Sequence, residues 1–80
     1  MNIKMGDIQK INGKDYQVAS IITEEEKDYY LISNVEDIED VTICEIKENT
    51  LEEITNEKLF EKLTYKFIKK ILEEQKDSNN

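Results

Sequence analysis

The segment from Thr55 to Glu74 constrains the fold most strongly, because it is the longest stretch with helical periodicity. Its apolar residues recur at intervals of three and four, so they gather on one side of a helix. These residues are Leu59, Phe60, Leu63, Phe67, Ile68, Ile71 and Leu72. Thr55 suits the N-cap position, where its hydroxyl accepts from N–H groups of the first turn. The segment therefore predicts one amphipathic helix that covers another apolar surface.

Shorter runs with the alternation typical of strands precede this helix and supply that surface. We expect strands near residues 8–11, 15–23, 29–34, 41–47 and 50–54. Residues 29–34 are apolar on both faces, which favours a central strand. In residues 15–23, strict alternation places Tyr16, Val18, Ser20 and Ile22 on one face.

The connections between these runs indicate how the strands pair. Asn12-Gly13 predicts a type I′ hairpin turn, because both central residues of that turn need a positive φ. Glu48-Asn49 predicts a second tight turn, whereas the charged residues 24–27 predict a loop of about four residues. The result is an α+β fold: an antiparallel meander of three to five strands, covered on one face by a single C-terminal helix. We expect one domain over residues 1–74, followed by a frayed polar tail over residues 75–80.

Charge is distributed unevenly along the chain. Residues 1–57 contain 15 acidic groups and five lysines, whereas residues 58–80 contain four acidic groups and six lysines. This acidic body opposes direct binding to nucleic acid, which needs clustered cations. It favours a protein partner with a basic surface. No run of the sequence approaches the length of a membrane span, and the N-terminal residues do not resemble a secretory signal, so we expect no membrane partner and a cytoplasmic location.

The residue types in the chain exclude several common chemistries. There is no histidine, which removes the commonest general base and the commonest metal ligand. A single cysteine, Cys44, excludes an internal disulfide and a multi-cysteine zinc site, and we expect it to be buried. With two glycines, the chain has no phosphate-binding glycine motif. We therefore predict no enzyme activity, no catalytic residue, no cofactor and no metal site.

The candidate binding residues are acidic side chains close to the expected strand ends. They are Glu24, Glu25, Glu26, Asp28, Glu36, Asp37, Glu39 and Asp40. Rows of carboxylates at one end of a sheet can stand in for phosphates against a basic groove. Tyr29 and Tyr30 point to opposite faces of their strand, so at most one lies under the helix. We predict that Tyr30 contacts a partner from the open face of the sheet.

The order of these features resembles that of a known family. Gly13-Lys14-Asp15-Tyr16, Tyr29-Tyr30-Leu31-Ile32, Glu45-Ile46 and Leu51-Glu52-Glu53-Ile54, followed by a terminal helix, resemble the YrzB-like small acidic proteins of Gram-positive bacteria. The function of that family is unknown, so the resemblance implies no catalytic residue. In size, acidity and order of elements, the chain is also similar to small acidic phage-encoded inhibitors. Its richness in Ile, Lys, Glu and Asn is typical of a low-GC bacterium or its mobile elements.

Two functions follow from these observations. The first is a non-catalytic protein-binding module, in its specific form a phage or mobile-element inhibitor whose acidic surface blocks a basic nucleic-acid-binding site of a partner protein. The alternative is a self-associating accessory protein that completes its core by forming a homodimer. On either hypothesis, the helix serves mainly as a structural lid for the sheet.

Overall fold

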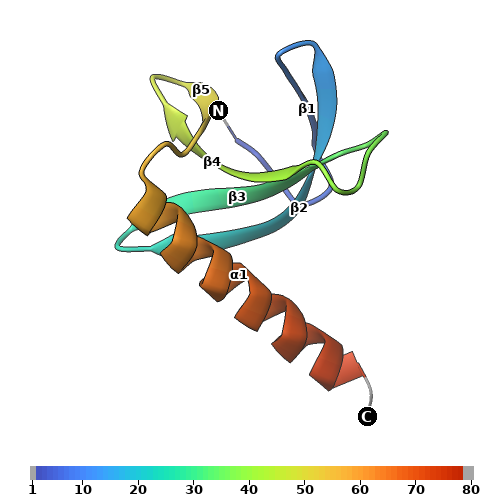
Figure 1. Ribbon diagram of the computed structural model, residues 1–80, viewed down its shortest axis with the longest axis vertical. Coiled ribbons are helices and arrows are strands. Elements are labelled where there is room, and N and C mark those ends of the chain that lie inside the picture. Colours follow the sequence, from blue (N-terminus) through green and yellow to red (C-terminus); the bar gives the residue numbers. More distant parts are fainter. Residues whose placement is uncertain (1, 79–80) are drawn as a thin grey trace.

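The computed structural model describes residues 2–78, with side chains through Gln75. These residues form five strands and one helix (Figure 1). The elements are β1 (Ile8–Ile11), β2 (Lys14–Glu24), β3 (Lys27–Asn34), β4 (Val41–Lys47), β5 (Thr50–Glu53) and α1 (Glu57–Ser78). The strands pair antiparallel in the order β1-β2-β3-β4-β5, so every strand lies beside its sequence neighbours. The predicted α+β meander with one C-terminal helix is confirmed.

Three two-residue turns join strands in this sheet. Each has positive φ at both central residues: 52° and 78° at Asn12-Gly13, 50° and 66° at Glu25-Glu26, and 49° and 65° at Glu48-Asn49. The tight turns predicted at Asn12-Gly13 and Glu48-Asn49 are therefore confirmed. The loop expected over residues 24–27 is instead a two-residue turn, since Glu24 and Lys27 pair directly. Pairing of the flanking strands imposes this geometry although glutamate has no preference for it.

β2 contains a bulge that reverses which residues face which side of the sheet. Val18 pairs with Ile32, but Ser20 pairs with Leu31, so Ala19 is the extra residue. Because Ile32 and Leu31 point to opposite faces, Val18 and Ser20 do as well. The predicted common face for Tyr16, Val18, Ser20 and Ile22 is therefore wrong beyond Val18.

The sheet is curled (Figure 1). It has a hydrophobic core on each face. The inner core, on the concave side, contains Ile3, Tyr16, Val18, Tyr30, Ile32, Cys44 and Leu51. The outer core lies under α1 and contains Tyr29, Ile43, Ile54, Leu63 and Phe67. Ile32 and Ile43 are 0% and 1% exposed, so the central part of the sheet is buried on both sides. The expectation of an open face opposite the helix is wrong, because the sheet curls around that face and Ile3 covers it.

α1 begins after an asparagine cap rather than a threonine cap. The Asn56 side-chain oxygen accepts from the Leu59 N–H at 3.1 Å, and the Asn56 carbonyl accepts from the Phe60 N–H at 2.9 Å. The cap predicted at Thr55 therefore lies one residue too early. The helix ends at Ser78, beyond the expected end at Glu74, and residues 79–80 of the expected tail lie outside the described residues.

Lysines attach one side of α1 to the end of β2. Lys62 and Lys66 both form ion pairs with Glu24, and the Lys70 ammonium donates to the Ile21 carbonyl at 2.6 Å. The 22 residues of α1 correspond to about 33 Å of helix, and its C-terminal half projects past the sheet (Figure 1). The polar contacts that hold α1 to β2 extend as far as Lys70.

Candidate protein-binding surfaces

The turn between β2 and β3 carries three of the predicted binding residues in exposed positions. Glu25 and Glu26 form the turn itself, and Asp28 lies two residues after Glu26. The Thr23 hydroxyl donates to the Asp28 carboxylate at 2.6 Å across the strand pair. This hydrogen bond orients the Asp28 side chain beside the turn.

The turn between β4 and β5 lies at the same end of the sheet. β3 begins and β4 ends there, and a shallow depression of about 270 Å³ is lined by Glu26 of the β2–β3 turn, by Lys27, Asp28 and Tyr30 of β3, and by Ile46 of β4. The β4–β5 hairpin has exposed carboxylates at Glu48, Glu52 and Glu53, but the curl of the sheet carries its turn away from the β2–β3 turn (Figure 1). Glu48, Glu52 and Glu53 are not among the predicted binding residues. We call the exposed carboxylates at the β2–β3 turn, Glu25, Glu26 and Asp28, the acidic end.

Lys27 is the cation closest in the sequence to Glu26 and Asp28, and it is already engaged. Its ammonium forms an ion pair with the buried Glu45 and lies 5.9 Å from the centre of the Tyr29 ring. The hydrogen bond to Glu45 raises the pKa of Lys27 above its usual value of 10.5. Lys27 therefore balances the charge of the buried Glu45 carboxylate rather than the charges of the exposed carboxylates.

Glu24, another predicted binding residue, is not free for a partner. Its two carboxylate oxygens pair with Lys62, at 3.3 Å, and with Lys66. The hydrogen bond from Lys66, and then that from Lys62, holds the pKa of Glu24 below its usual value of 4.5. Glu24 therefore joins α1 to the sheet.

The predicted acids of residues 36–40 lie in an ordered loop between β3 and β4. The Glu36 N–H donates to the Asn34 side chain at 2.9 Å, and the Glu39 N–H donates to the Asp37 carboxylate at 3.1 Å. Such side-chain turns fix the backbone locally. Glu36, Asp37 and Glu39 remain exposed at the surface.

Asp40, the last residue of this loop, is half-buried and hydrogen-bonded to the sheet. Its carboxylate accepts from the Tyr16 hydroxyl at 2.7 Å and from the Asn34 amide at 3.1 Å. The Tyr16 hydrogen bond, followed by that of Asn34, lowers the pKa of Asp40 below 3.8. Like Glu24, Asp40 has a structural partner, so it is a poor candidate for partner binding.

The two acidic groups of the prediction do not share one end of the sheet. The β2–β3 turn precedes β3 and the 36–40 loop follows it, so the eight residues of β3, about 26 Å, separate them. The acids therefore form two separate surfaces, the acidic end and the 36–40 loop, each with three exposed carboxylates among the predicted residues.

Tyr30 lies in the inner core and is 5% exposed. Burial, and then the charge of Asp28, raises the pKa of its hydroxyl. The Tyr30 ring lies in the inner core. Tyr30 therefore does not provide the exposed contact that the sequence predicts. Tyr29 occupies the outer core, which confirms that the two tyrosines face opposite sides.

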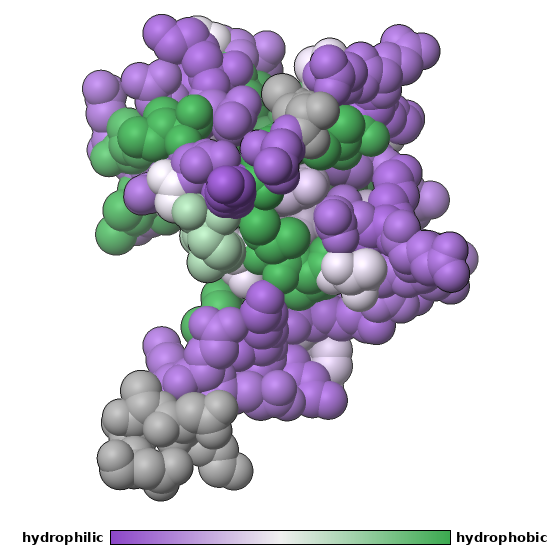
Figure 2. Space-filling view, turned by 180° about the vertical axis from the view of Figure 1, so that it is seen from behind, coloured by the Kyte–Doolittle hydropathy of each residue, from purple (hydrophilic) through white to green (hydrophobic). Residues whose placement is uncertain are grey.

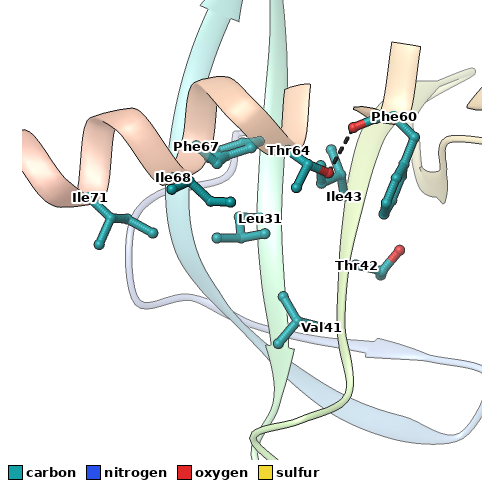
Figure 3. Close-up of a pocket in the computed structure, with 9 residues that line it drawn as sticks. All are labelled: Leu31, Val41, Thr42, Ile43, Phe60, Thr64, Phe67, Ile68 and Ile71. Atoms are coloured by element: carbon teal, nitrogen blue, oxygen red, sulfur yellow. Dashed lines mark hydrogen bonds between the residues drawn. The ribbon is translucent and has the colours of Figure 1, made fainter. Parts of the chain in front are cut away.

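An apolar cleft lies between α1 and the uncovered part of the sheet (Figure 3). It encloses about 350 Å³, with Leu31, Val41 and Ile43 on the sheet and Phe67, Ile68 and Ile71 on the helix. From behind, a notch is visible between the sheet and the projecting part of α1 (Figure 2). Sequence reasoning assigned all the apolar helix residues to one buried stripe, but Ile68 and Leu72 are 53% and 59% exposed.

The described residues give little sign of other chemistry. No group of three histidine, cysteine or acidic side chains among them converges on a possible metal position. Cys44 is fully buried, and burial, followed by the charge of Glu53, raises the pKa of its thiol to about 12. No helix in the part of the chain that the structure describes is long and apolar enough to cross a membrane.

The fold and these surfaces define a small α+β domain with a curled five-stranded meander and one covering helix. Comparisons with protein-family models, with curated proteins and with solved structures find no match to the chain.

Proposed function

We propose that this protein is a non-catalytic, cytoplasmic protein-binding module whose acidic end docks on a basic surface of a partner protein. In its specific form, it is an inhibitor from a phage or another mobile element that blocks the nucleic-acid-binding site of that partner. Its carboxylates would occupy positions that phosphates otherwise take. The same charge disfavours direct binding to nucleic acid.

The conformation of the β2–β3 turn carries this proposal. Glu25 and Glu26 both have φ in the left-handed region, at 50° and 66°, a conformation that costs a non-glycine residue about 1–2 kcal/mol. The chain uses Asn-Gly, the favoured pair, for the equivalent turn at Asn12-Gly13. Local strain of this kind persists most often at functional sites. Two glutamates at the unfavourable positions are therefore better explained by recognition than by folding.

Preorganisation supports the same function. The turn has two residues between paired strands, and the Thr23 hydroxyl orients Asp28. A partner that binds these carboxylates would have to order fewer side chains, which lowers the entropic cost of association. The nearest cation, Lys27, is paired with Glu45 and leaves the exposed acids available.

A charge-reversal experiment tests the proposal. The partner candidates are the DNA-binding proteins encoded beside the gene of this protein, and binding to each is measured by calorimetry at several salt concentrations. We expect Glu25→Lys with Glu26→Lys to weaken the complex by roughly tenfold or more and to reduce its dependence on salt. We also expect duplex DNA to compete with the wild-type protein for the partner.

Glu36→Lys with Glu39→Lys is the matched control, because it makes the same change of net charge at the opposite end of β3. This variant should retain most of the affinity. Equal weakening by both pairs would mean that net charge alone governs binding, and the acidic end would lose its assigned role. Unchanged affinity of the Glu25/Glu26 variant would also contradict the proposal.

A further inference from the structure

The outward side of α1 carries an apolar ridge that the fold does not cover. Tyr65, Ile68 and Leu72 are spaced by three and four residues, so they line one side of the helix. They are 70%, 53% and 59% exposed. An amphipathic helix that needed only to cover the sheet would carry polar residues at these positions. The ridge therefore extends the apolar surface of the helix beyond the part that covers the sheet, and Ile68 also lines the cleft.

The cleft beside this ridge has the properties of a docking surface rather than of a small-ligand site. Thr42 and Thr64 are its polar side chains, and the Thr64 hydroxyl already donates to the Phe60 carbonyl at 2.7 Å (Figure 3). Sites for small ligands usually combine an apolar lining with a few convergent polar or charged groups. The lining of this cleft includes no charged side chain. An apolar protein surface is a better match for it.

Charges beside the ridge and the cleft are of opposite sign. The 36–40 loop, with exposed Glu36 and Glu39, leads directly into Val41 at the cleft. Lys58 and Lys69 lie seven residues before and four residues after Tyr65, on the ridge side of α1. Unlike Lys62 and Lys66, they have no ion-pair partner among the described side chains. One chain therefore carries an apolar ridge flanked by lysines and an apolar cleft flanked by carboxylates.

We propose that the partner of the cleft is a second copy of this chain. In a two-fold symmetric dimer, the ridge of each copy packs into the cleft of the other, because a two-fold axis pairs two different patches reciprocally. Lys58 and Lys69 of each copy then approach the 36–40 loop of the other. This contact covers Ile68 and Leu72 of the ridge and Val41 of the cleft, large apolar side chains that the single chain leaves exposed. The β2–β3 turn lies at the other end of β3 and stays accessible, so dimerisation and the proposed partner binding are independent.

Sedimentation equilibrium over the micromolar range tests this dimer. We expect the wild-type protein to be dimeric, with an apolar core that tolerates added salt. Ile68→Glu with Leu72→Glu should weaken dimerisation by roughly tenfold or more, because it places charges in the buried contact. Circular dichroism should show a folded monomer, since both side chains lie outside the two cores.

Two further variants distinguish the arrangement from its competitors. Val41→Glu changes the sheet side of the cleft and should also produce monomers; a dimer that survives it would mean that the helices pair without the cleft, which contradicts the proposal. Glu25→Lys with Glu26→Lys should leave the dimer intact. A wild-type protein that is monomeric throughout the range would overturn the proposal and leave the cleft to a different protein or to solvent.

Discussion

At the scale of single residues, two of the predicted binding acids serve the fold instead. Glu24 accepts from two helix lysines, and Asp40 accepts from Tyr16 and Asn34. Each is a half-buried carboxylate that would be costly without these donors. The residues that remain available for recognition are those whose side chains project from turns.

The Tyr16–Asp40 hydrogen bond predicts how stability depends on pH. This hydrogen bond lowers the pKa of Asp40 below 3.8. The ionised Asp40 carboxylate therefore contributes to folding stability above pH 3.8, and that contribution is lost as pH falls through the pKa of Asp40 in the folded protein. The same bond, with burial, raises the pKa of Tyr16 from 10.0 to about 12. That contribution is complete below pH 10 and is lost as pH rises toward 12.

Tyr16→Phe removes both effects and should lower the melting temperature at neutral pH. Thermal unfolding followed by circular dichroism across pH should show shallower loss of stability on the acid side and on the alkaline side than in the wild type. Tyr65→Phe is the control, because it makes the same chemical change at an exposed tyrosine. Parallel profiles for wild type and Tyr16→Phe would show that the hydrogen bond does not form in solution.

At the scale of elements, the β2–β3 turn should limit stability. Glu25→Asn with Glu26→Gly introduces the residues that a type I′ turn prefers, so it should stabilise the protein by about 1 kcal/mol and raise the melting temperature by roughly 4–8 °C. The measurement is thermal unfolding under the same buffer conditions for all variants.

Removal of the two charges could also stabilise this acidic protein, so a second variant separates the causes. Glu25→Gln with Glu26→Gln removes the same charges without changing the backbone preference. The Asn-Gly variant should be the more stable of the two. Equal melting temperatures would attribute the gain to charge repulsion rather than to backbone strain.

At the scale of the whole molecule, one sheet carries both cores, and this should make unfolding a single cooperative event. Ile32 faces the inner core and Ile43 faces the outer core, and each is almost fully buried. Ile32→Val and Ile43→Val should each cost about 0.5–1.5 kcal/mol. In both variants, the helix signal in circular dichroism and the tyrosine fluorescence should shift together. A shift of one signal without the other would mean that the cores unfold separately.

Much of this architecture follows from local sequence patterns. The alternation in residues 41–47, the Asn12-Gly13 turn and the periodicity of residues 59–72 each depend on residues close together in the chain. Strand, turn and helix preferences act over that same range, so the elements and the antiparallel meander could be predicted. The excess of acid over the first 57 residues is likewise a property of the sequence alone.

The arrangement of the candidate surfaces depended on contacts between distant residues. The extra residue at Ala19, the closure of the inner core over Tyr30 and the pairing of Glu24 with Lys62 and Lys66 arise only when strands and helix meet. Tertiary structure also separated the two acidic groups by the length of β3 and left part of the helix's apolar surface uncovered. The sequence by itself therefore determined the elements and the charge. Packing decided which charges and which apolar side chains remain exposed, because burial is set by neighbours that lie far apart in the chain.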